Sequence, residues 1–371
     1  MVKIELTNRL NKKTLRESNL ELLRLICMLF IVIHHILIHA LHQVLGYDLV
    51  DLSKYTIIST LLDGFLYVAV DSFILISGYF SIKLKPDKLI HLYVLSACYG
   101  AMFYFLHLYI DGQSIGKTLF PNSIFVISNT QDLWFIQSYF YLCLFSPLLN
   151  RSIEYFKKKE HLIAIFSLTI LNVYFGFVWH NPVNSDGYNV MNFIYLYVIG
   201  QYIKRHISID LIIKFRNKLT FSYVLLSFLL GMLVLFSNYL SKGKESTIIL
   251  WTYNNPIVIM SSIIFFCIFL TFSFKSKAIN WLATSTLSVY LIHENSFIRH
   301  HIYNFIGRIC NYPIIINHII FTYIVVFIFA LLLMFICIFF DKVFQKIIKP
   351  IESLLAFVWS KIEIRFANIV N

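Results

Sequence analysis

Two side chains on the first long apolar stretch of the chain are of types that could act together on a polar substrate. Arg24 and His35 lie eleven positions apart. On an α-helix this leaves them within about 20° of the same direction and about 16 Å apart along the axis. A guanidinium binds carbonyl or phosphate oxygens through a fixed fork of donors, and an imidazole can act as a general base or a nucleophile. This spacing predicts a polar helix face that lines a passage.

Two more ionisable residues flank that line on the same stretch. Glu21 projects about 60° to one side of it and His34 about 80° to the other. Glu21 is therefore expected near the polar face, and His34 ranks second to His35 as the reactive imidazole. Taken alone, Arg24 would be a side chain that reaches back to the membrane interface, and a histidine near a span end would be an interfacial residue. Their alignment on one face favours the passage.

A carboxylate occurs within the second apolar stretch. Asp71 falls between the middle and the inner side of the predicted span, where an unpaired carboxylate would be untenable. Arg24 or a histidine of the first stretch is its expected partner, and a purely structural ion pair is the alternative. Ser77 and Gly78 follow and would permit close approach of a neighbouring helix, so packing alone could account for them.

Two later stretches carry further candidates. His293 and Glu294 end the ninth stretch at the level of His35, although placement at the membrane interface would explain them equally well. The fourth stretch begins with Trp134, which fits an aromatic belt better than a binding site. Gln137 and Tyr139 follow it and could offer hydrogen bonds to a polar ligand.

The composition determines the class of protein that must position these residues. Of 371 residues, 58% are hydrophobic, 17% aromatic and 13% charged. Soluble domains carry about 25% charged residues, so a water-soluble enzyme, a disordered chain and a secreted disulfide scaffold are excluded. The net charge of +12 includes no long basic stripe for nucleic acid and is typical of membrane topology. The six cysteines form no paired motif, so neither disulfides nor a structural metal is predicted.

Apolar stretches of the length that a bilayer requires, about 20 residues, predict an all-α integral membrane protein of about ten transmembrane helices. The expected spans are 19–41, 57–80, 89–110, 133–149, 161–179, 189–203, 220–240, 252–273, 281–298 and 315–340. Lys and Arg alternate across the connecting segments, with 24 on the set that includes both ends of the chain and 6 on the opposite set. The positive-inside rule then places both termini in the cytoplasm.

This topology gives a simple domain organisation. Residues 1–18 form a cytoplasmic N-terminal segment, 19–340 the transmembrane domain and 341–371 a cytoplasmic tail. The tail alternates apolar and basic residues in a way that predicts an amphipathic helix on the inner leaflet. The long loop at 111–132 is expected to cover the opposite face. Because no soluble domain is appended, any chemistry must occur within the membrane body.

Five motifs, taken in order, resemble the membrane acyltransferase 3 family over residues 20–340. The first is Arg24 and His35 with ten residues between them, and the second is the segment from Val70 and Asp71 to Ser77 and Gly78. The other three motifs are Leu133-Trp134-Phe135 with Tyr139 and Pro147, Asn192-Phe193 through Tyr197 to Gly200, and Tyr290-Leu291-Ile292-His293.

The resemblance implies a bundle of about ten helices in a bacterial cell membrane that moves acyl groups, commonly acetyl from acetyl-CoA, onto sugar hydroxyls of cell-envelope polysaccharides. Acetyl-CoA would be a substrate, with no permanently bound cofactor. The acceptor would be a polysaccharide or a lipid-linked sugar, with no role for nucleic acid. Members often carry an arginine-rich stretch after the second span, where this chain has three lysines, Lys83, Lys85 and Lys88.

The placement of the residues and the resemblance together imply their roles. Arg24 and the lysines would bind the donor, and His35 would act as general base or accept the acetyl group transiently. Asp71 would orient Arg24 or tune the imidazole, and His293 would orient the acceptor. Glu21, Ser77, Trp134, Gln137, Tyr139 and Glu294 would surround the acceptor. A polysaccharide exporter or flippase of the same fold is the main alternative, because it too needs a polar passage. A lipid-linked-sugar polymerase is weaker, because the 111–132 loop has no arginine.

Overall fold

The computed structural model is helical throughout the part of the chain that it describes, with no strand there, which confirms the all-α prediction. The described residues are 17–45, 52–112, 133–181, 184, 186–241 and 250–370, with side chains of 111 and 362–370 left aside. Nearly all of the predicted N-terminal segment 1–18 and of the predicted covering loop at 111–132 lies outside these ranges.

Six of the described helical segments are long and apolar enough to cross a membrane. They are Ser18–Ala40, Lys54–Phe80, Pro86–Ile110, Lys158–Val178, Arg216–Ser241 and Ile319–Lys361. Each exceeds the roughly 20 residues that the hydrocarbon core requires. The chain is therefore a multi-pass membrane protein, as its composition predicts.

The other four predicted spans correspond to shorter, more polar or divided helices. They are α7 (Trp134–Tyr155), α9 (Val190–His206), α12 (Pro256–Leu270) and the pair α13 (Lys277–Ala283) and α14 (Thr286–His293). The predicted span 281–298 is divided at a polar side chain. Ser285 stands between the two helices and donates a hydrogen bond to the buried carboxylate of Asp341 at 2.6 Å. That side-chain bond occurs where the helix is interrupted.

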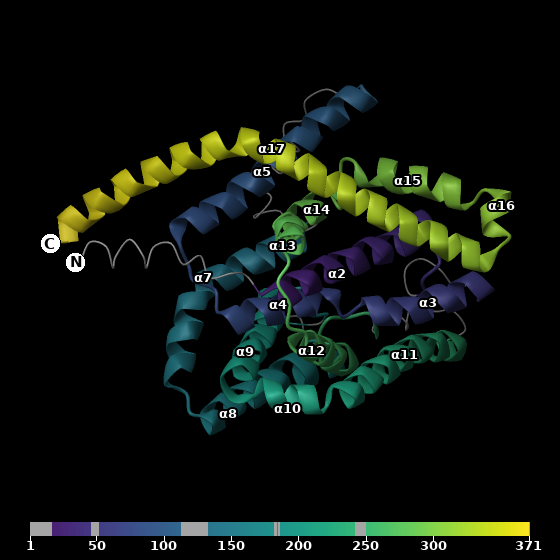
Figure 1. The fold of residues 1–371 in the computed structure, drawn as a ribbon, viewed down its shortest axis with the longest axis horizontal. Helices are drawn as coiled ribbons and strands as arrows, with labels where there is room; N and C mark the ends of the chain where they lie inside the picture. The colour runs from purple at the N-terminus through teal and green to yellow at the C-terminus, as the bar shows by residue number, and fades with distance from the viewer. Residues whose placement is uncertain are drawn as a thin grey trace.

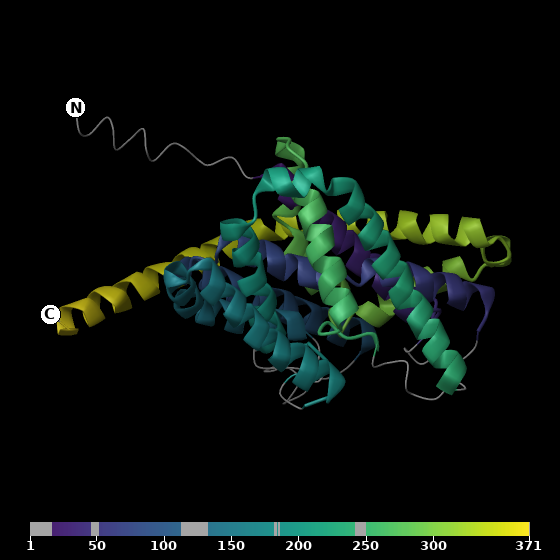
Figure 2. The ribbon, with the colours of Figure 1, turned by 90° about the horizontal axis from the view of Figure 1, so that it is seen from below.

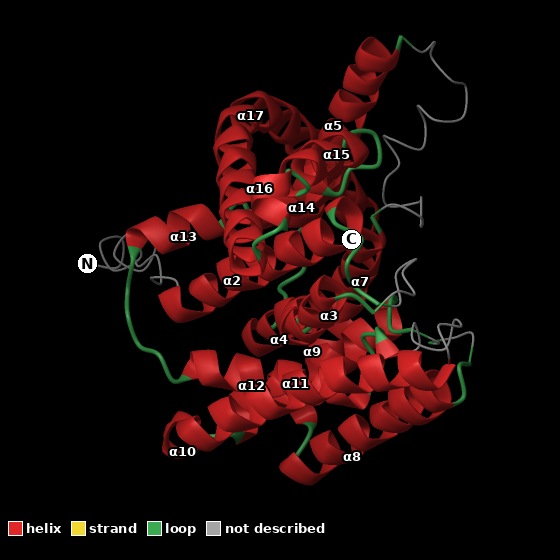
Figure 3. Ribbon diagram, turned by 90° about the vertical axis from the view of Figure 1, so that its right-hand side faces the viewer, coloured by secondary structure: helices red, strands yellow, loops and turns green. Residues whose placement is uncertain are grey.

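The centre of the bundle is the hairpin of α2 (Ser18–His35) with α3 (Lys54–Leu66) and α4 (Ala69–Phe80). Figure 3 shows α2 between two groups of helices. On one side lie α13, α14 and the long α17 (Ile319–Val370), all in contact with α2. On the other side α4 packs against α9 and α12, and α3 packs against α11 (Arg216–Ser241). Polar side chains on α2 are therefore enclosed by protein.

Glycine permits the closest of these contacts, between α4 and α9. A Cβ atom on Gly78 would lie 2.2 Å from the carbonyl oxygen of Tyr197, and one on Gly200 would lie 2.5 Å from that of Leu75. No other residue fits such a backbone approach. The predicted role of Gly78 in helix packing is thus confirmed, with α9 as its neighbour.

The remaining helices complete the outside of the bundle (Figure 1). They are α5 (Pro86–Asp111), α8 (Lys158–Thr169) with the π-helix η2 (Ile170–Val178), α10 (Ile209–Lys214), α15 (Arg299–Cys310) and α16 (Pro313–Ile316). The C-terminal part of α17 extends beyond the other helices (Figures 1 and 2). Its amphipathic character and position on a leaflet stay a prediction.

Candidate active site

A cavity of about 580 Å³ lies along α2, and both Arg24 and His35 line it. Its other walls come from α4, α5, α7, α13, α14 and α17, with further residues from the segments that precede α12 and α15. Because the two side chains are about 16 Å apart along the helix, the cavity is elongated. The polar passage that the sequence predicts beside this helix face therefore corresponds to a real hollow in the structure.

The helix that carries the histidines changes geometry directly after His35. Residues Ile36–Ala40 form a π-helix, η1, in which the N–H of Leu41 donates to the carbonyl of Ile36 at 3.1 Å. π-Turns occur frequently at functional sites. His39 lies within this wide turn, and its ring centroid is 5.5 Å from that of His35.

Hydrogen bonding assigns the tautomer of His35. His293 Nδ1 lies 2.6 Å from the backbone carbonyl of Val289, which can only accept, so His293 carries its proton there and its Nε2 is an acceptor. His35 Nδ1 faces two acceptors, that Nε2 at 3.2 Å and a carboxylate oxygen of Glu294 at 3.1 Å. His35 therefore carries its proton on Nδ1, and the lone pair is on Nε2, the nitrogen that can take a proton or attack a carbonyl.

Glu294 is held in place by two other side chains. The hydroxyl of Tyr303 donates to one carboxylate oxygen at 2.9 Å, and Arg299 lies 3.6 Å from the other. The carboxylate is nearly buried, with 6% of the residue exposed. A buried anion fixed in this way orients the His35 ring and stabilises positive charge on it, which is the task of the carboxylate in catalytic triads.

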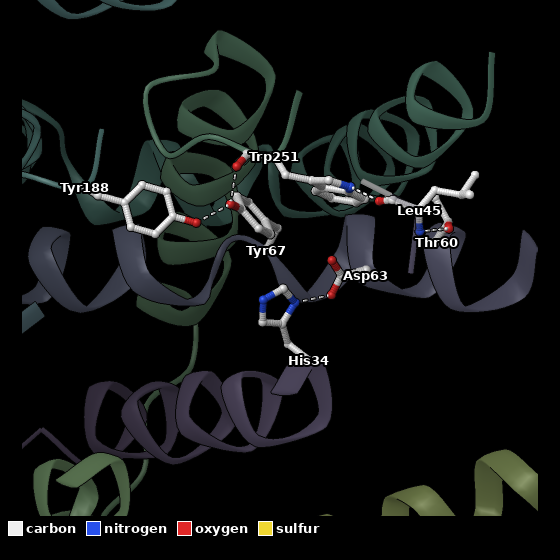
Figure 4. Close-up of polar contacts among 7 residues, drawn as sticks. All are labelled: His34, Leu45, Thr60, Asp63, Tyr67, Tyr188 and Trp251. Atoms are coloured by element: carbon white, nitrogen blue, oxygen red, sulfur yellow. Dashed lines mark hydrogen bonds and ion pairs between the residues drawn. The ribbon is translucent and has the colours of Figure 1, made fainter. Parts of the chain in front are cut away.

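A second imidazole–carboxylate pair adjoins the first. His34 Nδ1 lies 2.5 Å from the carboxylate of Asp63, which is fully buried on α3 (Figure 4). His34 also lines the cavity, and its ring centroid is 5.3 Å from that of His35. His34 thus reaches the cavity although its helical projection points away from the predicted polar line. Asp63 comes from a different helix.

Asp71 does not have the partner that the sequence predicts. Neither of its carboxylate oxygens has a hydrogen-bond partner among the described residues, and it is absent from the cavity wall. The amide of Asn192, on α9, lies beside it. Arg24 pairs instead with Glu21, at 2.8 Å and one helical turn away. The expected pairing of Asp71 with Arg24 or a histidine is wrong, because the Asp71 side chain lies toward Asn192 of α9, whereas its neighbours Val70 and Phe73 face the cavity.

Residues 17–340 match the family described as Acyltransferase domain, of the acyltransferase 3 type. The chain belongs to the acyltransferase 3 family. The match covers both imidazole–carboxylate pairs and ends within α17, so the last thirty residues or so lie outside it. No curated protein and no solved structure matches the chain.

The remaining site residues predicted for this acyltransferase fall into two groups. Ser77, Trp134 and Tyr139 line the cavity, so Trp134 belongs to the cavity wall rather than to an outward-facing belt. Gln137 is not among the lining residues, and its amide donates to the hydroxyl of Tyr141 at 3.2 Å. The predicted donor-binding lysines are exposed and outside the cavity wall; Lys83 and Lys85 directly precede α5, and Lys88 is in its first turn.

The acyltransferase also contains a grouping that the sequence analysis missed. Ligand atoms of His35, His39 and Glu294 lie within 4.8 Å of one another, an arrangement that could hold a metal ion. Asp63 was missed too. A second carboxylate eight residues before Asp71, on the same predicted span, was the available signal. The sequence does not show which helix such a carboxylate faces.

Proposed function

We propose that this acyltransferase is an integral-membrane O-acetyltransferase that moves acetyl from cytoplasmic acetyl-CoA to a sugar hydroxyl. The acceptor would be a cell-surface polysaccharide or exopolysaccharide, or its lipid-linked precursor, and the protein would reside in a bacterial cell membrane. One observation carries the proposal. His35, with its proton held on Nδ1 by Glu294 and His293, shares a cavity with the guanidinium of Arg24.

The distribution of charge supports a donor that enters from the Arg24 side. In the proposed topology of about ten spans, both termini and the lysine-rich segment after α4 are cytoplasmic. The phosphates of acetyl-CoA would be attracted to that basic surface, including Lys83, Lys85 and Lys88. Arg24 is 27% exposed and would bind a phosphate or carbonyl oxygen at the cavity mouth. The flexible arm of the donor would then extend along the cavity toward His35.

The chemistry requires a nitrogen lone pair beside the thioester. His35 Nε2 supplies it, either by removing the proton of the sugar hydroxyl as oxygen attacks the acetyl carbon or by attacking that carbon itself. In both cases the C–S bond breaks and its electron pair leaves with sulfur. The Glu294 carboxylate stabilises the positive charge that forms on the ring. An exporter or flippase of the same fold would need the passage but no imidazole of fixed tautomer.

The test uses the purified full-length protein in liposomes with [acetyl-¹⁴C]acetyl-CoA and p-nitrophenyl hexopyranosides as acceptors. Replacing His35 with Ala should lower acetyl transfer about 10³-fold or more, because the imidazole that serves as base or nucleophile is lost and Glu294 then has no ring to orient. Arg24→Ala should raise KM for acetyl-CoA. His42→Asn, on the same chain segment but outside the cavity, is the matched control. Full transfer by the His35 variant would refute the assignment, and export of glycan without any transfer by the wild type would favour the exporter.

A further inference from the structure

Aromatic side chains form a wall of the cavity next to His34. Trp134 and Tyr253 line the cavity, and their rings are stacked with centroids 5.4 Å apart. Tyr188 backs them, with its ring centroid 4.6 Å from that of Trp134 and 4.7 Å from that of Tyr253. Tyr67 stacks on Tyr253 at 4.9 Å. These four residues are named the aromatic wall; Trp134 and Tyr253 line the cavity, and Tyr67 and Tyr188 support them without lining it.

Hydrogen bonds make the aromatic wall rigid. The hydroxyl of Tyr67 donates to the backbone carbonyl of Trp251 at 2.6 Å and lies 2.9 Å from the hydroxyl of Tyr188 (Figure 4). The indole of Trp251 in turn donates to the carbonyl of Leu45, in the segment that follows η1. The wall is thereby tied to the chain that carries the histidines.

The two histidines, whose ring centroids are 5.3 Å apart, have different neighbours. The ring of His34 meets the edge of Tyr67 at a centroid distance of 5.7 Å, so His34 and Asp63 adjoin the aromatic wall. The ring of His35 meets those of His39 and His293 instead, each with a centroid distance under 6 Å. Each imidazole has a carboxylate of its own, from α3 for His34 and from the end of α14 for His35. One pair cannot substitute for the other without moving a helix.

We propose that the aromatic wall binds the sugar ring of the acceptor and that the His34–Asp63 pair is the base for its hydroxyl, while His35 carries the acetyl group. The C–H groups on the flat face of a pyranose are attracted to the electron-rich faces of aromatic rings, and its hydroxyls remain at the rim for hydrogen bonding. Nδ1 of His34 is bonded to Asp63, so Nε2 is the nitrogen that takes the proton. This inference rests on the proposed function and adds the acceptor subsite and the second base.

Acetyl transfer then takes two steps, acetylation of His35 and transfer from His35 to the sugar. His35 Nε2 attacks the thioester carbon, a C–N bond forms, the C–S bond breaks and CoA leaves as thiolate. The positive acetyl-imidazolium faces Glu294. The sugar hydroxyl then gives its proton to His34 while its oxygen attacks the acetyl carbon, so that a C–O bond forms and the C–N pair returns to His35. His34 passes its proton to the thiolate. The 5.3 Å between the ring centroids allows one hydroxyl to reach both rings.

Isotope exchange separates the two histidines. An enzyme that carries acetyl on His35 exchanges label between acetyl-CoA and free [³H]CoA without any acceptor. The probes are [³H]CoA for exchange, and p-nitrophenyl hexopyranosides and methanol for transfer, all with the full-length protein in liposomes. We expect His34→Gln to lower transfer to both acceptors about 10²- to 10⁴-fold and to retain exchange. His35→Gln should abolish exchange and transfer together.

Asp63 is a positioning residue that orients the His34 ring. Partial recovery of the transfer rate by a conservative variant tests this role. Asp63→Asn should lower transfer about 10²-fold or more, because the wrong tautomer of His34 is then favoured, and it should leave exchange intact. Asp63→Glu should recover part of the rate, and added imidazole should recover part of it in His34→Ala. Asp210→Asn, an exposed carboxylate on α10, is the control for charge removal. Loss of folding would remove exchange as well, so retained exchange shows that the variants fold.

The role of the aromatic wall is tested by comparing a sugar acceptor with methanol. Tyr253→Leu should raise KM for the hexopyranosides about tenfold and leave transfer to methanol unchanged, because methanol has no ring to stack. Equal effects on both acceptors would overturn the subsite. Transfer by the wild type without exchange, or loss of exchange in a folded His34 variant, would overturn the division between the histidines. Neither result would affect the proposed function, which fails only if the wild type transfers acetyl to no sugar.

Discussion

Two carboxylates of the span formed by α3 and α4, eight residues apart, occupy opposite environments. Asp63 meets an imidazole at 2.5 Å, and that imidazole lines the cavity. Asp71 is equally buried but faces α9, where no described group bonds to its oxygens. A carboxylate within a membrane span is a candidate for function by default. The contrast shows that the helix it faces, not its presence in the span, determines whether it can act on the substrate.

Exchanging each carboxylate for an amide is the sharpest test of this contrast. We expect Asp63→Asn to lower acetyl transfer about 10²-fold or more and Asp71→Asn to lower it less than tenfold. An amide at position 71 avoids burying a negative charge without a partner, so the thermal stability of the Asp71 variant should equal or exceed that of the wild type. Acetyl transfer and thermal unfolding in detergent measure the two effects. Comparable losses of acetyl transfer in both variants would contradict the proposed difference between Asp63 and Asp71.

The contact that encloses Asp71 should be sensitive to volume. Gly78→Ala places a Cβ against the backbone of Tyr197 and should destabilise the protein by about 1–3 kcal/mol through overpacking of α4 on α9. Gly112→Ala is the control. Its Cβ meets nothing within 4 Å, and only its positive φ of 61° is unfavourable. A temperature shift no larger than that of the control would show that α4 and α9 can move apart freely.

A partly exposed imidazole–carboxylate pair, His91 with Glu352, should give the smallest of these effects on the protein. His91 Nδ1 lies 2.7 Å from Glu352, with 43% and 21% of the side chains exposed. Solvent-exposed pairs typically contribute about 0.2–1 kcal/mol, so Glu352→Gln should shift thermal unfolding slightly, and less at high salt. An effect as large as that of Asp63→Asn on transfer would mean that the geometry of His91, which lines the cavity, matters for the donor.

Helical periodicity predicts the position of Arg24 and His35 well. Both lie on one long regular helix and line one cavity, so a period of 3.6 residues suffices to bring them to one face. The all-helical membrane fold and the family could also be predicted, because composition and ordered motifs carry them. The division of the predicted span 281–298 could not be predicted, because it coincides with a single side-chain bond from Ser285 to the distant Asp341.

The partners of the histidines could not be predicted from the sequence. His34 is about 80° from the predicted line on an ideal helix, yet α3 crosses α2 there and brings Asp63 to it. The sequence favours Asp71, because it lies deeper in its predicted span. Which of two carboxylates meets an imidazole depends on how two helices cross and on a close contact with a third. These are features of tertiary packing, and the periodicity of the sequence does not predict them.

The π-turn at Ile36–Ala40 makes the chemistry of this protein vulnerable to the smallest possible change in length. A wide turn of this kind contains one residue more than regular α-helical winding needs. Loss of a single codon there would let α2 wind on without interruption, at no cost in hydrophobicity. The residues beyond the turn would keep their register, because the wide turn had absorbed the extra residue, but His39 would follow His35 by three positions instead of four if the lost residue lay between them. The His39 ring would then shift relative to that of His35, which would stay in place, so the number of residues in this turn matters as well as their identity.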